Sequence, residues 1–129
     1  MTLPTDANVD FLLCDEVRQT PDGKLDLAGY FPVDEIKIDS SAHLPGEIHL
    51  TFVFVLKDGD GQFEAVLRLA DPLGKELHEY RFDKFEKLAG FPHSVMLRVT
   101  RIPIIALGDY EVSLEIEGQR YRRPVRIYQ

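Results

Sequence analysis

Residues 110–128 read YEVSLEIEGQRYRRPVRIY, and this stretch decides the fold class because apolar and polar side chains alternate along it. Apolar side chains occupy every second position from Tyr110 to Ile116, with mostly glutamate between them. Alternation with a period of two is typical of a β-strand that buries one face. Gly118 interrupts the pattern near its centre, so we predict two antiparallel strands joined by a tight turn.

The register of this hairpin follows if Gly118 and Gln119 form the turn, since a type II′ turn favours glycine in its first position. Oppositely charged side chains then face each other across one side of the hairpin, and apolar side chains do so on the other. Each such pair contributes about 0.2–1 kcal/mol. The predicted pairs are Glu117 with Arg120, Glu115 with Arg122, Glu111 with Arg126, Ile116 with Tyr121, Val112 with Val125 and Tyr110 with Ile127. Arg123 does not fit the alternation, which predicts that it lies at the sheet margin or beside a bulge.

The rest of the chain shows the same alternation, most clearly over residues 47–57, and Gly- and Pro-containing turns separate the apolar runs. The pattern predicts about eight or nine short strands. It allows at most one short helix, near residues 83–89, where Asp83 and Glu86 form a capping box. We therefore predict a single domain over residues 1–129, all-β, folded as a two-sheet antiparallel sandwich. Tyr110, just after Gly108, resembles the corner tyrosine of immunoglobulin-like sandwiches and favours that topology.

The composition limits the possible partners and the compartment. The 129 residues carry a net charge of −7, and this acidic excess argues against nucleic acid and membrane as partners, because phosphate binding requires clustered Lys and Arg. The single cysteine, Cys14, has no disulfide partner within the chain, which suits a reducing compartment. The N-terminus has no signal-peptide pattern, and no apolar run reaches the ~20 residues of a membrane span. We expect a soluble, cytoplasmic protein.

Two parts of the chain resemble a known protein family. The segment Cys14-Asp15-Glu16-Val17-Arg18 and the later segment from Gly23 to Phe31 are similar to the pattern CD-x-V-R … GKL-x-L-x-G-x-F. This pattern opens a family of small bacterial proteins of unknown function. The strand from Gly108 to Gly118 is similar to that family's G-x-Y-x-V-x-L-x-I-x-G strand. The resemblance implies a bacterial β-sandwich; it implies no activity, and no site residue is transferred.

The Asp-Gly loop at residues 58–61 is a weak candidate for a calcium site, through Asp58 and Asp60. It lacks the glycine at position six and the glutamate at position twelve that an EF-hand loop requires. A sandwich can instead gather calcium ligands from several loops, and Asp71 and Asp109 would then contribute. Aspartate and glycine are also the residues that a hairpin turn needs, and we favour that structural interpretation.

The C-terminal arginines Arg120, Arg122 and Arg126 form the second candidate site, an interaction surface. Basic residues interleaved with aromatics are typical of nucleic-acid surfaces. In the predicted hairpin, however, each of the three faces a glutamate, which leaves little free positive charge. We therefore favour a structural role for these arginines within the hairpin. They remain a candidate surface for binding a protein, and we expect no nucleic-acid partner.

We identify no catalytic residue, metal ligand or cofactor site in the sequence. Cys14 lies among apolar residues, as expected for a buried, unreactive thiol. The four histidines, His43, His49, His78 and His93, lack the close spacing of a metal-binding pair.

The most consistent hypothesis is a non-catalytic module that binds a protein partner, or a second copy of itself, through a sheet face or an open edge. The alternative is the binding of a small ligand, such as calcium or a carbohydrate, by loops at one end of the sandwich. An enzyme has the least support. The fold class alone does not separate these possibilities.

Overall fold

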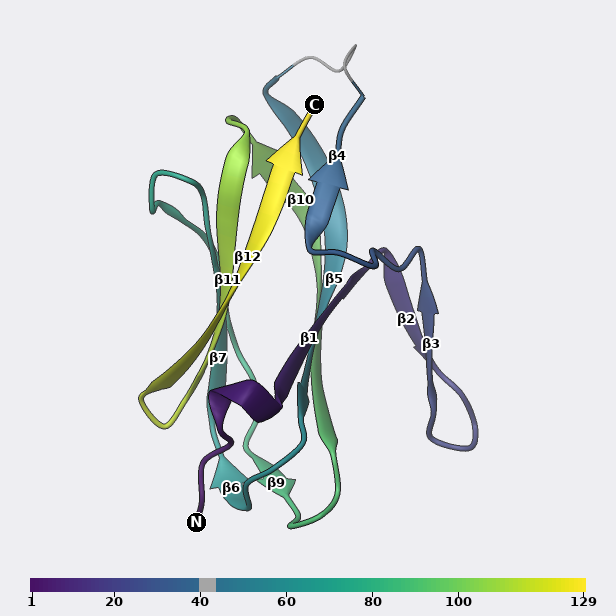
Figure 1. Ribbon diagram of the computed structural model, residues 1–129, viewed down its shortest axis with the longest axis vertical. Coiled ribbons are helices and arrows are strands. Elements are labelled where there is room, and N and C mark those ends of the chain that lie inside the picture. The colour runs from purple at the N-terminus through teal and green to yellow at the C-terminus, as the bar shows by residue number, and fades with distance from the viewer. Residues whose placement is uncertain (40–43) are drawn as a thin grey trace.

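The computed structural model describes residues 1–39 and 44–129, and its main strands form two facing sheets (Figure 1). The three-stranded sheet contains, in spatial order, β1 (Val9–Cys14), β5 (Gly46–Leu56) and β10 (His93–Ile104). The five-stranded sheet contains, in spatial order, β4 (Glu35–Lys37), β12 (Gln119–Tyr128), β11 (Gly108–Ile116), β7 (Ala65–Ala70) and β8 (Glu76–Arg81). The predicted all-β class is therefore confirmed, with a sandwich-like arrangement of sheets.

Two short strand pairs lie outside the main sheets: β2 (Glu16–Gln19) with β3 (Leu25–Ala28), and β6 (Gly61–Phe63) with β9 (Phe85–Lys87). The described residues thus form twelve strands rather than the eight or nine predicted, together with one 3-10 turn, η1 (Asp6–Asn8). The arrangement is also not wholly antiparallel, because β4 and β12 run parallel.

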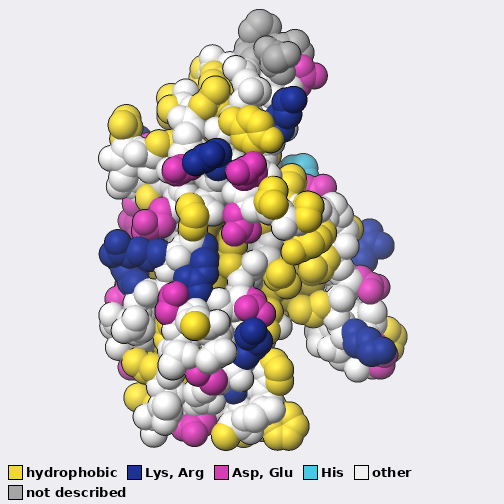
Figure 2. All heavy atoms as spheres, in the orientation of Figure 1, with side chains coloured by type: hydrophobic (Ala, Val, Ile, Leu, Met, Phe, Trp, Pro, Cys, Tyr) yellow, Lys and Arg dark blue, Asp and Glu magenta, His cyan; other side chains and the backbone are white. Residues whose placement is uncertain are grey.

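The extra strands at the N-terminal end come from a break at Asp15. β1 joins the three-stranded sheet, whereas β2 turns away with β3 into a hairpin that projects from the body (Figure 1). Gly29 permits this break, because a Cβ at this position would lie 2.1 Å from Oδ2 of Asp15. Hydrophobic side chains gather where the hairpin leaves the body (Figure 2).

The core lies between the two sheets and is built from the inward-facing residues of the long strands. The central strands β5, β7 and β11 supply most of its fully buried side chains: Phe52, Phe54, Leu56, Leu67, Val112, Leu114 and Ile116. Fully burying an aliphatic or aromatic side chain of this size contributes about 1.5–3 kcal/mol. The alternation that predicted the strands therefore also identifies the core.

The predicted register of the last hairpin is wrong by two residues. Ile116 lies opposite Gln119, so the loop consists of Glu117 and Gly118, both with positive φ (48° and 86°). Positive φ at both central residues defines a type I′ turn, whose twist matches that of the flanking strands. The observed pairs replace those predicted: Glu115 with Arg120, Ser113 with Arg122, Asp109 with Arg126, Leu114 with Tyr121, Tyr110 with Val125, and Gly108 with Ile127.

The sequence allowed at most one short helix, near residues 83–89; no helix forms there, and Phe85–Lys87 form strand β9 instead. Phe85 pairs with Phe63 of β6, and their rings meet edge-on with centroids 6.1 Å apart. Lys87 is fully buried two residues later, on the same side of the strand. These tertiary contacts outweigh the local capping signal, because helix propensity is a weak determinant over so few residues.

The Tyr110 hydroxyl donates to the carbonyl oxygen of Ala106, four residues earlier, at 2.7 Å. A second buried tyrosine, Tyr121, donates to the carbonyl oxygen of Pro4 at 2.5 Å and so fixes the N-terminal segment to β12. Arg123 lies opposite Val112, with no bulge before Pro124, on the part of β12 that does not pair with β4, and it contacts the same segment. Within the described residues, no helix has both the length and the apolar character that crossing a membrane requires.

Candidate interaction surfaces

The predicted arginine surface lies on the outer face of the five-stranded sheet, where its members form ion pairs. Arg120 lies 3.8 Å from Glu115, and Arg122 lies 3.8 Å from Glu111. Lys and Arg side chains are accordingly interspersed with Asp and Glu over β11 and β12 (Figure 2). Arg126 pairs with Asp109 at 3.1 Å. Each arginine thus has a carboxylate partner, although in none of the three cases is it the one that the predicted register gave.

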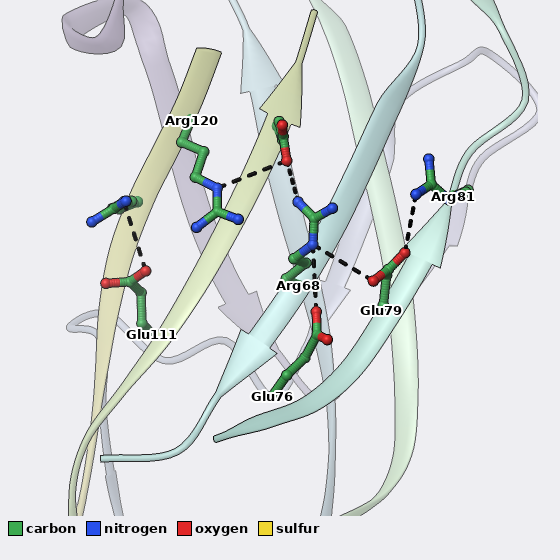
Figure 3. A network of polar contacts seen from close by, with 8 residues as sticks. Arg68, Glu76, Glu79, Arg81, Glu111 and Arg120 are labelled. Carbon is green, nitrogen blue, oxygen red and sulfur yellow. Dashed lines mark hydrogen bonds and ion pairs between the residues drawn. The ribbon is translucent and has the colours of Figure 1, made fainter. Parts of the chain in front are cut away.

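Arg68 on β7 is the centre of this charged face (Figure 3). Its guanidinium bonds to Glu115 and lies 3.4 Å from Glu76 and 3.7 Å from Glu79. The hydrogen bond from Arg68 lowers the pKa of the Glu115 carboxyl, and the positive charge of Arg68 adds to this effect. Because Arg68, Arg120, Arg122 and Arg126 each pair with a carboxylate, the face offers little free positive charge to attract a polyanion.

The Asp-Gly loop binds the chain's own N-terminal segment. The Asp58 carboxylate accepts hydrogen bonds from the Thr5 amide (2.9 Å), the Thr5 hydroxyl (2.7 Å) and the Asn8 side-chain amide (3.1 Å). These bonds, with that of the Thr5 hydroxyl the largest cause, lower the pKa of Asp58. Asp60 pairs through its backbone with Thr2. The loop therefore holds residues 2–8 in place through hydrogen bonds from Asp58 and Asp60.

The other aspartates considered for calcium are also engaged elsewhere. Asp71 caps its own turn by accepting from the amides of Leu73 and Lys75, both at 2.9 Å, and Asp109 pairs with Arg126. Among residues 1–39 and 44–129, no group of three or more His, Cys, Asp or Glu side chains is placed to hold a metal ion. The four aspartates therefore do not converge on one site.

Cys14 is buried, and its thiol donates to the carbonyl oxygen of Thr51 at 3.9 Å. Burial raises the pKa of this thiol, and the nearby Asp15 raises it further. A raised pKa leaves little thiolate, the nucleophilic form. Of the histidines, His43 lies outside the described residues, and His49 is exposed on β5.

A further surface, not identified from the sequence, is the open edge of β10. This strand is twelve residues long, and within residues 1–39 and 44–129 it pairs only with β5, so its other side borders the opening between the two sheets. A cleft lies in that opening. It is lined on one side by residues of β8, β9 and their connection and on the other by residues of β10, including Tyr80, Phe82, Phe85, His93, Val95 and Met96.

Aromatic rings dominate the lining of this cleft. The Phe85 and His93 rings stack with centroids 4.5 Å apart and planes within 2° of parallel. Tyr80 and Phe82 meet edge-on at 4.9 Å, and Tyr80 is 45% exposed. Partly exposed aromatics in a concave setting are typical of binding surfaces. One feature of the sequence sets this region apart: residues 87–108, which include β10, contain no Asp or Glu, although the chain is acidic overall.

Protonation of His93 is expected to destabilise the protein. Burial lowers the pKa of His93, and the positive charge of Lys87 lowers it further. As the pH falls through about 6.5, His93 is therefore protonated in the unfolded chain before it is protonated in the folded protein. The contribution of neutral His93 to the free energy of unfolding is fully present above this pH and is lost progressively below it. We expect the melting temperature to fall between about pH 7 and pH 5, and His93→Gln to flatten that slope. His49→Gln serves as the control; equal slopes in the wild type and His93→Gln would contradict the assignment.

The fold and these surfaces define an all-β, sandwich-like protein. A family model described as "Family of unknown function (DUF6941)" matches residues 9–127. The chain belongs to this family. It has no match among curated proteins.

Comparison with solved structures gives distant similarities. A β-glucosidase from Listeria innocua in complex with isofagomine is 13% identical with a TM-score of 0.42, and its complex with gluconolactone is 14% identical with a TM-score of 0.43. Each match covers 94% of this chain but only 16% of the β-glucosidase chain. At this level of similarity, the function of this chain has to be inferred from its own surfaces.

Proposed function

We propose that the protein is a non-catalytic module that binds an extended segment of a protein partner, or of a second copy, by strand addition at the open edge of β10. The observation that carries this proposal is the one-sided pairing of a twelve-residue strand beside an aromatic cleft. Unpaired backbone groups along an edge provide the affinity in such complexes, and pockets beside the edge provide the specificity.

Part of the edge of β10, from Ser94 to Val99, lacks most of the features that usually block strand addition. Such features are short length, charged side chains, especially lysine, proline, and bulges that twist the edge away; Arg98 is the one charged side chain in this part. From Ser94 to Val99, β10 pairs regularly with β5 and contains neither proline nor lysine; its bulge and its proline come later, between Val99 and Ile104. The other edge strands are shorter: β1 and β8 have six residues each, and β4 has three.

The non-catalytic part of the proposal is supported by the state of the candidate nucleophile, since the Cys14 thiol is buried with a raised pKa. A buried cysteine without a disulfide also supports a reducing, cytoplasmic environment. A bacterial origin is supported by the resemblance of the opening segments to those of small bacterial proteins.

An immunoglobulin-like topology is supported by the strand order. In that fold one sheet carries strands A, B and E, and the other carries G, F and C. Taking β1, β5, β7, β10, β11 and β12 as A, B, C, E, F and G reproduces both orders. Strand D of that fold continues the sheet beyond E. The open edge of β10 is therefore the position at which strand D would pair.

Synthetic peptides of about eight residues, the length of an ordinary strand, test strand addition. Each alternates valine with threonine, glutamate or lysine, and a matched version has proline at alternate positions, which removes backbone donors. We expect at least one alternating peptide to bind, as measured by fluorescence anisotropy, and its proline version not to bind. Met96→Lys, which places an edge lysine on β10, should weaken binding, whereas Leu73→Lys in an exposed turn should not. No binding, or equal binding of the proline version, would contradict the proposal.

A further inference from the structure

We propose that the segment added to β10 is acidic and is recognised by Arg98 and Arg101. This inference rests on the proposed strand addition and specifies the chemistry of the partner. Of the chain's nine arginines, seven form an ion pair with a carboxylate: Arg18, Arg68, Arg81, Arg120, Arg122, Arg123 and Arg126. Among the described residues, only Arg98 and Arg101 have no such partner, and both are exposed on β10.

The surroundings of Arg98 leave its charge available, and Arg101 lies in the bulge that follows Val99. β10 contains no Asp or Glu. On the outer face, Arg98 lies beside Thr51 and Met96 in a shallow depression that Glu16 of β2 also borders, but the Glu16 carboxylate pairs with Arg18 at 3.4 Å. At the cleft, the exposed residues Asp83 and Lys84 are adjacent and of opposite charge. The edge is thus locally positive in a protein whose net charge is −7.

The orientation of side chains on β10 predicts the pattern of the partner sequence. Val95 and Val99 face the core, whereas Met96 and Arg98 face outward, because alternate residues of a strand point to opposite faces. An added strand extends the same pleat. Its inward side chains would enter the cleft beside Tyr80 and Phe82, and its outward side chains would lie beside Arg98. The structure therefore favours an extended segment in which apolar residues alternate with Asp or Glu.

The expected preference is testable with the three alternating peptides. The valine–glutamate peptide should bind most tightly and the valine–lysine peptide least, and the preference should shrink as salt screens the charges. Arg98→Gln combined with Arg101→Gln should weaken binding of the valine–glutamate peptide by about five- to thirtyfold, since each exposed ion pair contributes up to about 1 kcal/mol. Binding of the valine–threonine peptide should change by less than about twofold.

A second pair of substitutions, Arg122→Gln with Arg126→Gln, makes the same charge change on the opposite sheet and serves as the control. It should leave peptide affinity unchanged, and thermal unfolding of both double variants should show that they remain folded. Equal binding of the three peptides, or equal losses in the two double variants, would overturn the acidic preference while leaving strand addition intact. Binding of a single-stranded oligodeoxynucleotide in place of the peptides would also overturn it. Failure of all peptides to bind would overturn the proposed function itself.

Discussion

Replacing Lys87 with alanine is expected to lower the free energy of unfolding by roughly 3 kcal/mol. Lys87 is 1% exposed, and its ammonium donates to the carbonyl oxygens of Gly59 (3.1 Å) and Leu88 (2.7 Å). The substitution removes the long apolar stem from a packed site and leaves both carbonyl oxygens without this donor. The expected drop in melting temperature is roughly 10 °C for a chain of this size.

The variant Lys87→Met separates the contribution of the ammonium group from that of the apolar stem, because methionine retains most of the side-chain volume of lysine. We expect this variant to lose about 1–2 kcal/mol, because the carbonyl oxygens lose their donor while the packing is kept. Lys84→Ala, an exposed lysine three residues earlier, should change stability by less than about 0.5 kcal/mol. Urea denaturation measures all three; a Lys87→Ala variant as stable as Lys84→Ala would contradict the role assigned to Lys87.

Replacing Arg123 with alanine is expected to cost about 2–3 kcal/mol. Its guanidinium donates to the carbonyl oxygens of Asp6 (3.0 Å), Val9 (2.8 Å) and Arg122 (2.7 Å) and to the Asp6 carboxylate (3.0 Å). The Arg123 side chain is only 17% exposed, so solvent replaces these bonds poorly. The loss should appear both in the free energy of unfolding and in faster amide exchange of residues 5–9.

Arg126 on the same strand provides the matched control for Arg123. It makes one ion pair, with Asp109, and both side chains are more than half exposed. Arg126→Ala should therefore cost less than about 1 kcal/mol. Arg123→Lys keeps the charge but not the forked geometry, and we expect it to recover only part of the loss. Equal stability of Arg123→Ala and Arg126→Ala would show that Arg123 does not fix the N-terminal segment.

The last hairpin shows what alternation in a sequence can and cannot predict. Its strands and their buried faces were predicted correctly, because each follows from the period of two. The register was predicted incorrectly, because a shift of two residues keeps the same side chains on the buried face and on the exposed face, so the alternation fits both registers equally well. The turn decides between the two registers, and it places Glu117, a residue with no strong preference for positive φ, in the left-handed region.

The candidate sites divide in the same way. The structural interpretation of Arg120, Arg122 and Arg126 depended on carboxylates across the hairpin, and carboxylates are present even in the shifted register. The contact of Asp58 with Thr5 joins positions far apart in the chain, so no local pattern indicated it. The cleft beside β10 was missed for the same reason, because its residues come from three strands whose arrangement depends on the topology of the sheets.

Two surfaces of the sandwich therefore have contrasting character. The outer face of the five-stranded sheet has its charges paired within the protein, and such pairing favours a solvated surface over a strongly attractive one. The open edge of β10 has unpaired backbone and two arginines without carboxylate partners, and it lies beside the aromatic cleft. Because these three properties coincide at one edge, we infer that it is the binding edge of the protein.

Amide hydrogen exchange, measured residue by residue with and without the valine–glutamate peptide, tests strand addition at β10 most directly. An added strand forms backbone hydrogen bonds with alternate residues of the edge. We predict that the peptide slows exchange at alternate amides between Ser94 and Val99, and leaves exchange along β11 and β12 unchanged. Slower exchange on the charged face of β11 and β12, with none on β10, would contradict strand addition at this edge.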